Sequence, residues 1–217
     1  GILAYPITII FIVAIINCIN LIDGLDGLSS GIASIYFLTI GVIAMLLNNS
    51  NGLDIILTFI MLGSTLGFLV HNFNPAKIFM GDTGSLTLGY ILSFLAIKYS
   101  QNNQSLTFFT EGALLIAFST LIIPAFDVIR VVMLRIRNGR NPFEPDRNHI
   151  HHKFLAMGFT PRKAMIIILL ISCGFSALNI ILMPYVDNTI MLLGDIIVWV
   201  ALNLWWDHIR NIKLKKK

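Results

Sequence analysis

The sequence ILAYPITIIFIVAIINCINLIDGLDG, residues 2–27, passes from an uninterrupted apolar run into amides, carboxylates and glycines. A helix needs about 20 residues to cross roughly 30 Å of hydrocarbon, and the run at about 2–22 has that length. A membrane barrel strand would need only about 10 residues with alternating polarity, which this run lacks. The stretch therefore predicts a transmembrane helix that ends on polar side chains at one membrane edge, because a helix satisfies its own backbone groups in lipid.

The whole chain has the composition of an integral membrane protein. Of its 217 residues, 56% are hydrophobic and only 12% are charged. A soluble domain has roughly 25% charged residues, so the composition excludes a water-soluble enzyme. We expect an all-α, polytopic transmembrane helix bundle in which residues 1–217 form a single membrane domain. Its seven expected spans lie at about 2–22, 28–47, 55–71, 84–100, 111–134, 164–183 and 190–207.

The distribution of basic residues predicts the orientation of this bundle. The connectors 48–54, 101–110 and 184–189 contain no Lys or Arg, whereas the segment 135–163 and the C-terminal tail are rich in both. Cytoplasmic loops carry the excess of Lys and Arg, so the segment 135–163 is expected to be a large cytoplasmic loop. We expect a multi-pass protein of the cell inner or plasma membrane, with its active site on the cytoplasmic face.

A first polar cluster ends the first expected span. Asn17, Asn20 and Asp23 recur every three residues and would share a broad helix face, and Asp26 follows between glycines. Amides and carboxylates at a membrane edge suit a hard cation or a hydroxyl-rich ligand. The alternative is a helix exit built from turn-forming Asp and Gly.

A second cluster, HNFNPAKIFMGDTGS, occupies residues 71–85 and includes Lys77. Glycines on both sides of Asp82 allow the close backbone approach that a phosphate–Mg²⁺ site needs. Thr83 and Ser85 are residue types that cap the start of a helix. A capped turn that binds no ligand is the alternative interpretation.

A third cluster, RNPFEPDRNHIHH, occupies residues 140–152. His149, His151 and His152 lie beside Arg147, and such donors fit an anionic diphosphate. A structural zinc site is disfavoured, because no Cys is near and the neighbours are basic. A basic loop lying on lipid headgroups would explain the arginines but gives no reason for the histidines.

Carboxylates within the expected spans suggest an alternative functional class. Asp127 is followed by Arg130, for which an i,i+3 ion pair is the simplest interpretation and a role in shaping the nearby site is the alternative. Asp195 lies inside the last span, and membrane carboxylates also mark the paths of cation- or proton-coupled transporters. The other acids and the histidines gather on one side of the membrane, which favours chemistry at its surface.

The clusters occur in four longer stretches. These are NCINLIDGLDGLSSG (17–31), HNFNPAKIFMGDTGSLTLG (71–89), PAFDVIRV (124–131) and NPFEPDRNHIHHKFLAMGFT (141–160). In this order and spacing they resemble the polyprenyl-phosphate N-acetylhexosamine-1-phosphate transferase superfamily, glycosyltransferase family 4. The Pro-Asp-Arg-x-His-Ile-His-His form is similar to the undecaprenyl-phosphate GlcNAc-1-phosphate transferase branch. The alternative branch, which uses UDP-MurNAc-pentapeptide, typically carries three consecutive histidines.

The resemblance implies a magnesium-dependent phospho-sugar transferase. Such an enzyme transfers GlcNAc-1-phosphate, or a related HexNAc-1-phosphate, from a UDP-sugar to undecaprenyl or another polyprenyl phosphate and releases UMP. The reaction is the first membrane step in the synthesis of a cell-envelope glycopolymer such as lipopolysaccharide. The implied cofactor is Mg²⁺, for which Mn²⁺ can substitute. The implied partners are the UDP-sugar, the lipid acceptor, membrane lipids and a second copy of the chain in a homodimer, with no nucleic acid.

The resemblance also assigns residues. It implies Asn20 and Asp82 as metal ligands, and Asp23, Asp26 and Asp82 as catalytic residues at the nucleotide–metal centre. The expected substrate-binding residues are Asn17, Lys77, Asp127, Arg147, His149, His151 and His152.

One family feature is missing from the sequence. The family carries an adjacent Asp-Asp pair on an earlier helix and normally has ten or eleven spans, but this chain contains no Asp-Asp. We therefore expect the chain to be the C-terminal portion of a longer enzyme and residues 1–217 alone to be inactive. The corresponding alternative is a non-catalytic fragment that retains the nucleotide-sugar site.

Overall fold

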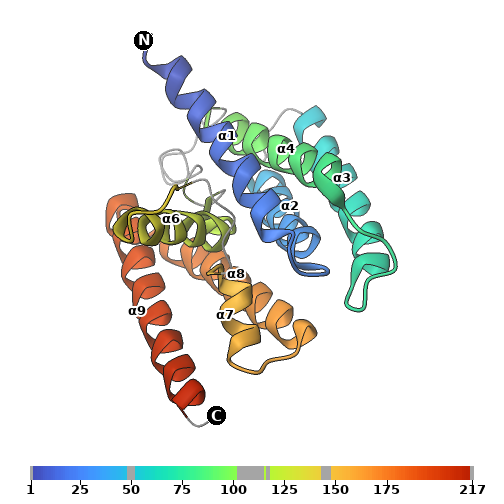
Figure 1. The fold of residues 1–217 in the computed structure, drawn as a ribbon. Coiled ribbons are helices and arrows are strands. Elements are labelled where there is room, and N and C mark those ends of the chain that lie inside the picture. Colours follow the sequence, from blue (N-terminus) through green and yellow to red (C-terminus); the bar gives the residue numbers. More distant parts are fainter. Residues whose placement is uncertain (1, 48–51, 102–114, 116–117, 143–147, 216–217) are drawn as a thin grey trace.

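The computed structural model describes residues 2–47, 52–101, 115, 118–142 and 148–215. Within these residues every regular element is an α-helix, as the sequence predicts (Figure 1). In chain order the helices are α1 (Ala4–Ile22), α2 (Leu28–Leu47), α3 (Gly52–Asn72), α4 (Gly81–Gln101), α6 (Ile122–Arg137), α7 (Ile150–Ala156), α8 (Pro161–Leu182) and α9 (Asn188–Lys215).

Five helices, α1, α2, α3, α8 and α9, are long and apolar enough to cross a membrane. They coincide with five of the expected spans, which confirms a polytopic helical membrane protein. The last helix continues to Lys215, beyond the expected end at 207. Helix α4 has 21 residues and matches the expected span 84–100, but its more polar composition leaves it outside these five.

The expected span 111–134 differs most from the structure. Residues 111–114 and 116–117 lie outside the described part of the chain, and a turn at Thr120 precedes α6. In an unbroken helix the Thr120 carbonyl would accept a hydrogen bond from residue 124, but Pro124 has no N–H. Instead, the Ser172 hydroxyl of α8 donates to this carbonyl at 2.7 Å. The 16 residues of α6 span only about 24 Å, and in Figure 1 the helix lies crosswise to α9.

The segment 135–163, expected to be a loop, is partly helical. It contains the end of α6, the seven-residue α7 and the first turn of α8. Thr160 caps α8, because its hydroxyl accepts a hydrogen bond from the Lys163 N–H at 3.4 Å and Pro161 occupies the first helical turn. The histidine motif is therefore carried by a short helix between α6 and α8.

The first four helices pack as two close pairs, α1 with α4 and α2 with α3. The α1–α4 contact is tight at Gly89, where a Cβ would lie 2.6 Å from the Ile16 Cα. Small residues let membrane helices approach in this way. The pairs are joined by the Tyr36 hydroxyl of α2, which donates to the Leu92 carbonyl of α4 at 2.8 Å. This packing brings the end of α1 beside the beginning of α4.

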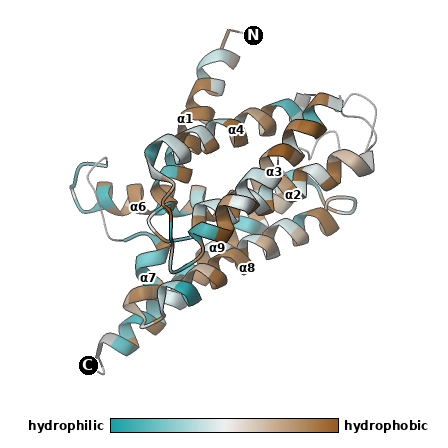
Figure 2. Ribbon diagram, turned by 90° about the vertical axis from the view of Figure 1, so that its right-hand side faces the viewer, coloured by the Kyte–Doolittle hydropathy of each residue, from teal (hydrophilic) through white to brown (hydrophobic). Residues whose placement is uncertain are grey.

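The surface of the bundle agrees with a lipid environment. Helices α1 and α3 expose large apolar side chains, including Ile10 at 68% and Val70 at 74%. Figure 2 shows hydrophobic residues along most of the bundle and hydrophilic residues concentrated around α7 and the C-terminal end of α9. The polar residues are therefore gathered toward one part of the molecule.

Replacing Gly89 with Ala should destabilise the α1–α4 pair. The new methyl group would collide with the backbone at Ile16, so we expect a loss of about 1–3 kcal/mol, measured as thermal unfolding in detergent. Gly174→Ala in α8 is the matched control, because its Cβ meets nothing within 4 Å and it gains the same helix propensity. Equal stability of the two variants would contradict the close-packing interpretation.

Candidate active site

The end of α1 and the beginning of α4 form the first part of the site. The Asn20 amide nitrogen donates to Asp82 Oδ1 and to the Ser85 hydroxyl, both at 2.9 Å. Asp82 lies in the first turn of α4, where the helix dipole favours a negative charge. The close α1–α4 packing thus joins two of the predicted clusters.

The turn between α1 and α2 supplies two more carboxylates. Asp23 accepts a hydrogen bond from the Ser29 hydroxyl. Asp26 Oδ2 accepts from the Asn74 side chain at 3.0 Å and from the Ala76 N–H at 3.1 Å. These bonds connect the turn at residues 23–27, here called the Asp-Gly turn, to the segment that follows α3.

Burial raises the pKa of Asp23 above its usual value, and the negative charges of Asp82 and Asp26 raise it further. The hydrogen bond from Ser29 opposes this increase but does not cancel it. Three acidic groups are therefore close enough to repel one another. Such a cluster favours a bound cation or a ligand that brings positive charge.

Asn72 is a structural part of the site that the sequence analysis did not assign. Its Oδ1 accepts from the Gly27 N–H at 2.9 Å and from the Ser30 hydroxyl at 3.1 Å, and its amide nitrogen donates to the Ile78 carbonyl at 2.9 Å. Ser29 and Ser30 are fully buried. Two serines at the start of an apolar helix, directly after the Asp-Gly turn, were the available sequence signal for this network.

Asp127 joins α6 to the histidine helix. Its Oδ1 accepts from Arg130 Nη2 at 2.7 Å, which confirms the predicted i,i+3 ion pair. Its Oδ2 lies 2.9 Å from His149 Nδ1 and accepts from the Ile150 N–H at 3.0 Å. His149 is the N-cap residue of α7, and a carboxylate can only accept, so His149 donates through Nδ1 and leaves Nε2 for another partner.

His151 brings α7 onto the Asp-Gly turn. A Cβ at Gly24 would lie 3.0 Å from His151 Nε2, so glycine permits this approach. The His151 ring stacks with that of His149 at a centroid distance of 6.0 Å, and it lies 4.2 Å from the ring of His152. Burial, followed by the neighbouring histidines, lowers the pKa of His151 to about 4, so its imidazole is neutral at pH 7.

The structure thus gathers most of the predicted residues from three distant parts of the sequence. Asn20, Asp23, Asp82 and His151 meet around the ends of α1, α4 and α7. Asn17 instead donates to the Val13 carbonyl within its own helix at 3.0 Å. Lys77 is exposed on the segment after α3, and Arg147 lies outside the described residues.

The donor set of Asn20 and Asp82 fits a magnesium ion that is shared with a ligand. Among the described residues no hydrogen bond reaches the Asn20 amide oxygen, which leaves it free beside the exposed Asp82 carboxylate. Within that same part of the chain, no three His, Cys, Asp or Glu residues form a metal-binding group. Mg²⁺ usually binds one or two carboxylates together with substrate phosphates and water, so a complete protein cage is not required.

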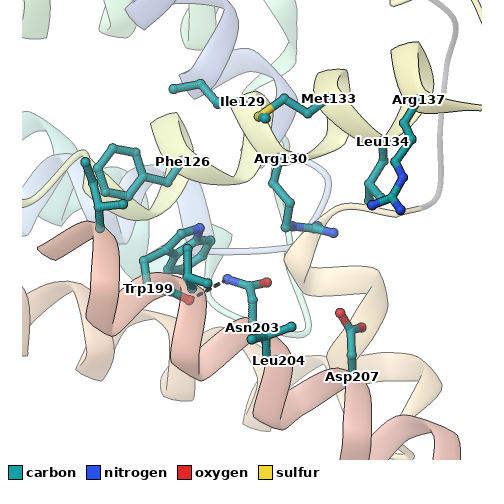
Figure 3. Close-up of a pocket in the computed structure, with 12 residues that line it drawn as sticks. Phe126, Ile129, Arg130, Met133, Leu134, Arg137, Trp199, Asn203, Leu204 and Asp207 are labelled. Carbon is teal, nitrogen blue, oxygen red and sulfur yellow. Dashed lines mark hydrogen bonds between the residues drawn. The ribbon is translucent and has the colours of Figure 1, made fainter. Parts of the chain in front are cut away.

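A groove of about 660 Å³ lies beside this region, between α6 and α9 (Figure 3). Its walls are mainly apolar side chains of the two helices. Four polar residues also line it, namely Arg130, Arg137, Asn203 and Asp207.

These features define a helical membrane protein with one polar site built from helix ends. Residues 1–100 match glycosyl transferase family 4. With the relatives described next, this match confirms the resemblance to glycosyl transferase family 4 that the four stretches predicted.

Three curated relatives illustrate the branch of the family. A probable undecaprenyl-phosphate N-acetylglucosaminyl 1-phosphate transferase from Bacillus subtilis is 44% identical over 182 residues, which cover 84% of this chain and 49% of the relative. A decaprenyl-phosphate N-acetylglucosaminephosphotransferase from Mycolicibacterium smegmatis is 35% identical over 65% of this chain and 38% of the relative. An undecaprenyl-phosphate alpha-N-acetylglucosaminyl 1-phosphate transferase from Yersinia pestis is 29% identical over 82% and 50%. The chain spans about half the length, or less, of these relatives.

Replacing Gly24 with Ala should displace His151. We expect a roughly tenfold loss of activity with little change in stability, because the ring must move by a few tenths of an ångström, and Gly24→Val should lose more. Gly63→Ala in α3 is the control, since its Cβ would enter open space. Unchanged activity in both Gly24 variants would separate His151 from the reaction.

His151 should also make stability depend on pH. Its pKa is about 4 in the folded protein and about 6.5 in the unfolded chain, so the unfolded chain binds more protons between these values. Stability should therefore fall by up to about 3 kcal/mol as the pH decreases from about 6.5 to about 4. Thermal unfolding of His151→Gln over the same range should show a smaller decrease; parallel curves would contradict the assignment.

Proposed function

We propose that the protein transfers N-acetylglucosamine 1-phosphate, or a related N-acetylhexosamine 1-phosphate, from a UDP-sugar to a polyprenyl phosphate and releases UMP. The observation that carries the proposal is the contact between the histidine helix and the Asp-Gly turn, next to the Asn20–Asp82 pair. The names of the relatives support the sugar and the lipid acceptor. The same names favour this branch over a pentapeptide-transferring enzyme.

The proposed reaction brings two anions together, a sugar-nucleotide diphosphate and a lipid phosphate. Positive charge and fixed donors must offset their repulsion. Asn20 and Asp82 would hold Mg²⁺, which would neutralise charge on the diphosphate. The neutral imidazole of His151 would donate its ring N–H to a phosphate oxygen and so orient it.

Direct displacement is the simplest chemistry for this site. A lipid phosphate is mostly dianionic at neutral pH, since its second pKa is about 6, and can attack without a strong base. An oxygen of the lipid phosphate bonds to the phosphorus next to the sugar, and the bond from that phosphorus to the bridging oxygen breaks. UMP leaves with that oxygen, so the chain's residues mainly position the reactants and stabilise charge.

The groove between α6 and α9 supports an isoprenoid acceptor. It offers mainly apolar walls together with the guanidinium group of Arg137. An isoprenyl phosphate needs these two features in one place. The concentration of Lys and Arg in the segment 135–163 and in the C-terminal tail supports a cytoplasmic location for the site.

A transporter is less well supported. Asp195, which lies inside the last expected span, accepts a hydrogen bond from the Asn179 amide of α8 at 2.9 Å. This bond gives Asp195 a role in holding α9 against α8. Asp23 and Asp82 lie at helix ends and Asp26 lies in the turn between α1 and α2, rather than along one path through the bundle.

Asp82→Asn should reduce transfer roughly 100-fold or more while the fold is retained, because it removes a charged ligand at an exposed position. The measurement is Mg²⁺-dependent exchange of labelled UMP into UDP-GlcNAc in membranes that contain the protein and polyprenyl phosphate. Asp187→Asn, an exposed carboxylate before α9, is the control. Near-normal exchange by Asp82→Asn would refute the metal assignment. No exchange by the unmodified chain, even when it is supplied with an N-terminal portion that carries the Asp-Asp pair, would refute the proposed function.

A further inference from the structure

Lys153 is a buried cation on the side of α7 away from His151. Two residues along a helix turn the side chain by about 200°, so Lys153 points away from the Asp-Gly turn. Its side chain is only 2% exposed. Such a charge is costly to bury unless it is paired and hydrogen-bonded, and this one is paired with α9.

Two side chains of α9 accept the hydrogen bonds of Lys153. The Lys153 Nζ donates to Asn203 Oδ1 and to Asp207 Oδ2, each at 3.0 Å. The two acceptors are four residues apart and therefore share one face of α9. Figure 3 shows both beside the groove, with the Asn203 amide nitrogen donating to the Trp199 carbonyl at 3.0 Å, which directs its oxygen toward Lys153.

Other contacts extend this α7–α9 junction. The Phe154 and Trp206 rings pack at a centroid distance of 5.1 Å. Beyond the end of α7, Lys213 Nζ donates to the Met157 carbonyl at 2.7 Å and lies 5.3 Å from the centre of the Phe159 ring. The last helix thus contacts the second half of α7 and the residues that follow it.

The shortness of α7 makes these contacts important. A seven-residue helix is too short to be stable alone, so its position must come from tertiary contacts. The Asp127 carboxylate fixes its first residue from the α6 side. The Lys153 bonds fix its opposite face from the α9 side, and together they determine where His151 lies.

We propose that Asn203 and Asp207 are positioning residues for the sugar-nucleotide site, which they support by holding α7 through Lys153. The proposal rests on the proposed function above. In the part of the chain that the structure describes, neither side chain hydrogen-bonds to the Asp-Gly turn, so their effect is indirect, through the orientation of the histidine helix. Outer-shell partners of this kind typically change activity or affinity by about 10–100-fold when they are removed.

The first test separates positioning from general loosening of α9. Asp207→Ala and Asn203→Ala should each raise the KM for UDP-GlcNAc roughly tenfold and retain most of kcat when donor and lipid are both saturating. Asp207→Glu, which keeps the carboxylate, should recover part of the loss. Asp195→Ala is the matched control, because this buried α9 carboxylate pairs with Asn179 of α8 and not with α7. An equal rise in donor KM for Asp195→Ala, or no rise for Asp207→Ala, overturns the proposal.

A second measurement does not depend on turnover. Hydrogen exchange of the α7 amides, residues 150–156, should become roughly tenfold faster in Asp207→Ala and stay unchanged in Asp195→Ala. Unchanged α7 exchange in Asp207→Ala overturns the positioning role even if the unmodified protein is active. Absence of UMP exchange in the unmodified chain supplied with an N-terminal portion that carries the Asp-Asp pair instead refutes the proposed function, so the two failures are distinguishable.

Discussion

The buried Asp127 carboxylate is the interaction on which the geometry of the site most depends. It accepts hydrogen bonds from Arg130 on its own helix and from His149 and Ile150 at the start of α7. A carboxylate buried without such donors would be strongly destabilising, so the burial and the three bonds require one another. One side chain thereby connects the helix before the histidine motif to the beginning of the helix that carries it.

That contact depends in turn on the break before α6. Inside a membrane every backbone group needs a partner, and the missing N–H of Pro124 leaves the Thr120 carbonyl without its helical donor. The Ser172 hydroxyl supplies the replacement bond. Because the helix restarts at Ile122 and lies crosswise to α9, Asp127 reaches the histidine helix, and α6 also forms one wall of the groove.

Much of the architecture could be predicted because lipid imposes a simple rule on sequence. Apolar runs of about 20 residues predicted the five helices that can cross a membrane, and helical spacing predicted the Asp127–Arg130 pair. The same rule failed at 111–134, where hydropathy remained high across a turn. The buried bonds of Asn72 were also missed, since a single amide at the end of a helix carries no periodic signal.

The sequence by itself determined which residues are polar in an otherwise apolar chain and on which helix ends they lie, because burial in lipid excludes such side chains from long spans. It could not determine which ends meet. Asn20 and Asp82 are 62 residues apart, and Lys153 and Asp207 are 54 apart. A helical pattern specifies which face of a helix is polar or apolar, but not which other helix packs against that face. The neighbour was decided by tertiary packing, such as the close approach at Gly89, and by the need of each buried charge for an opposite partner.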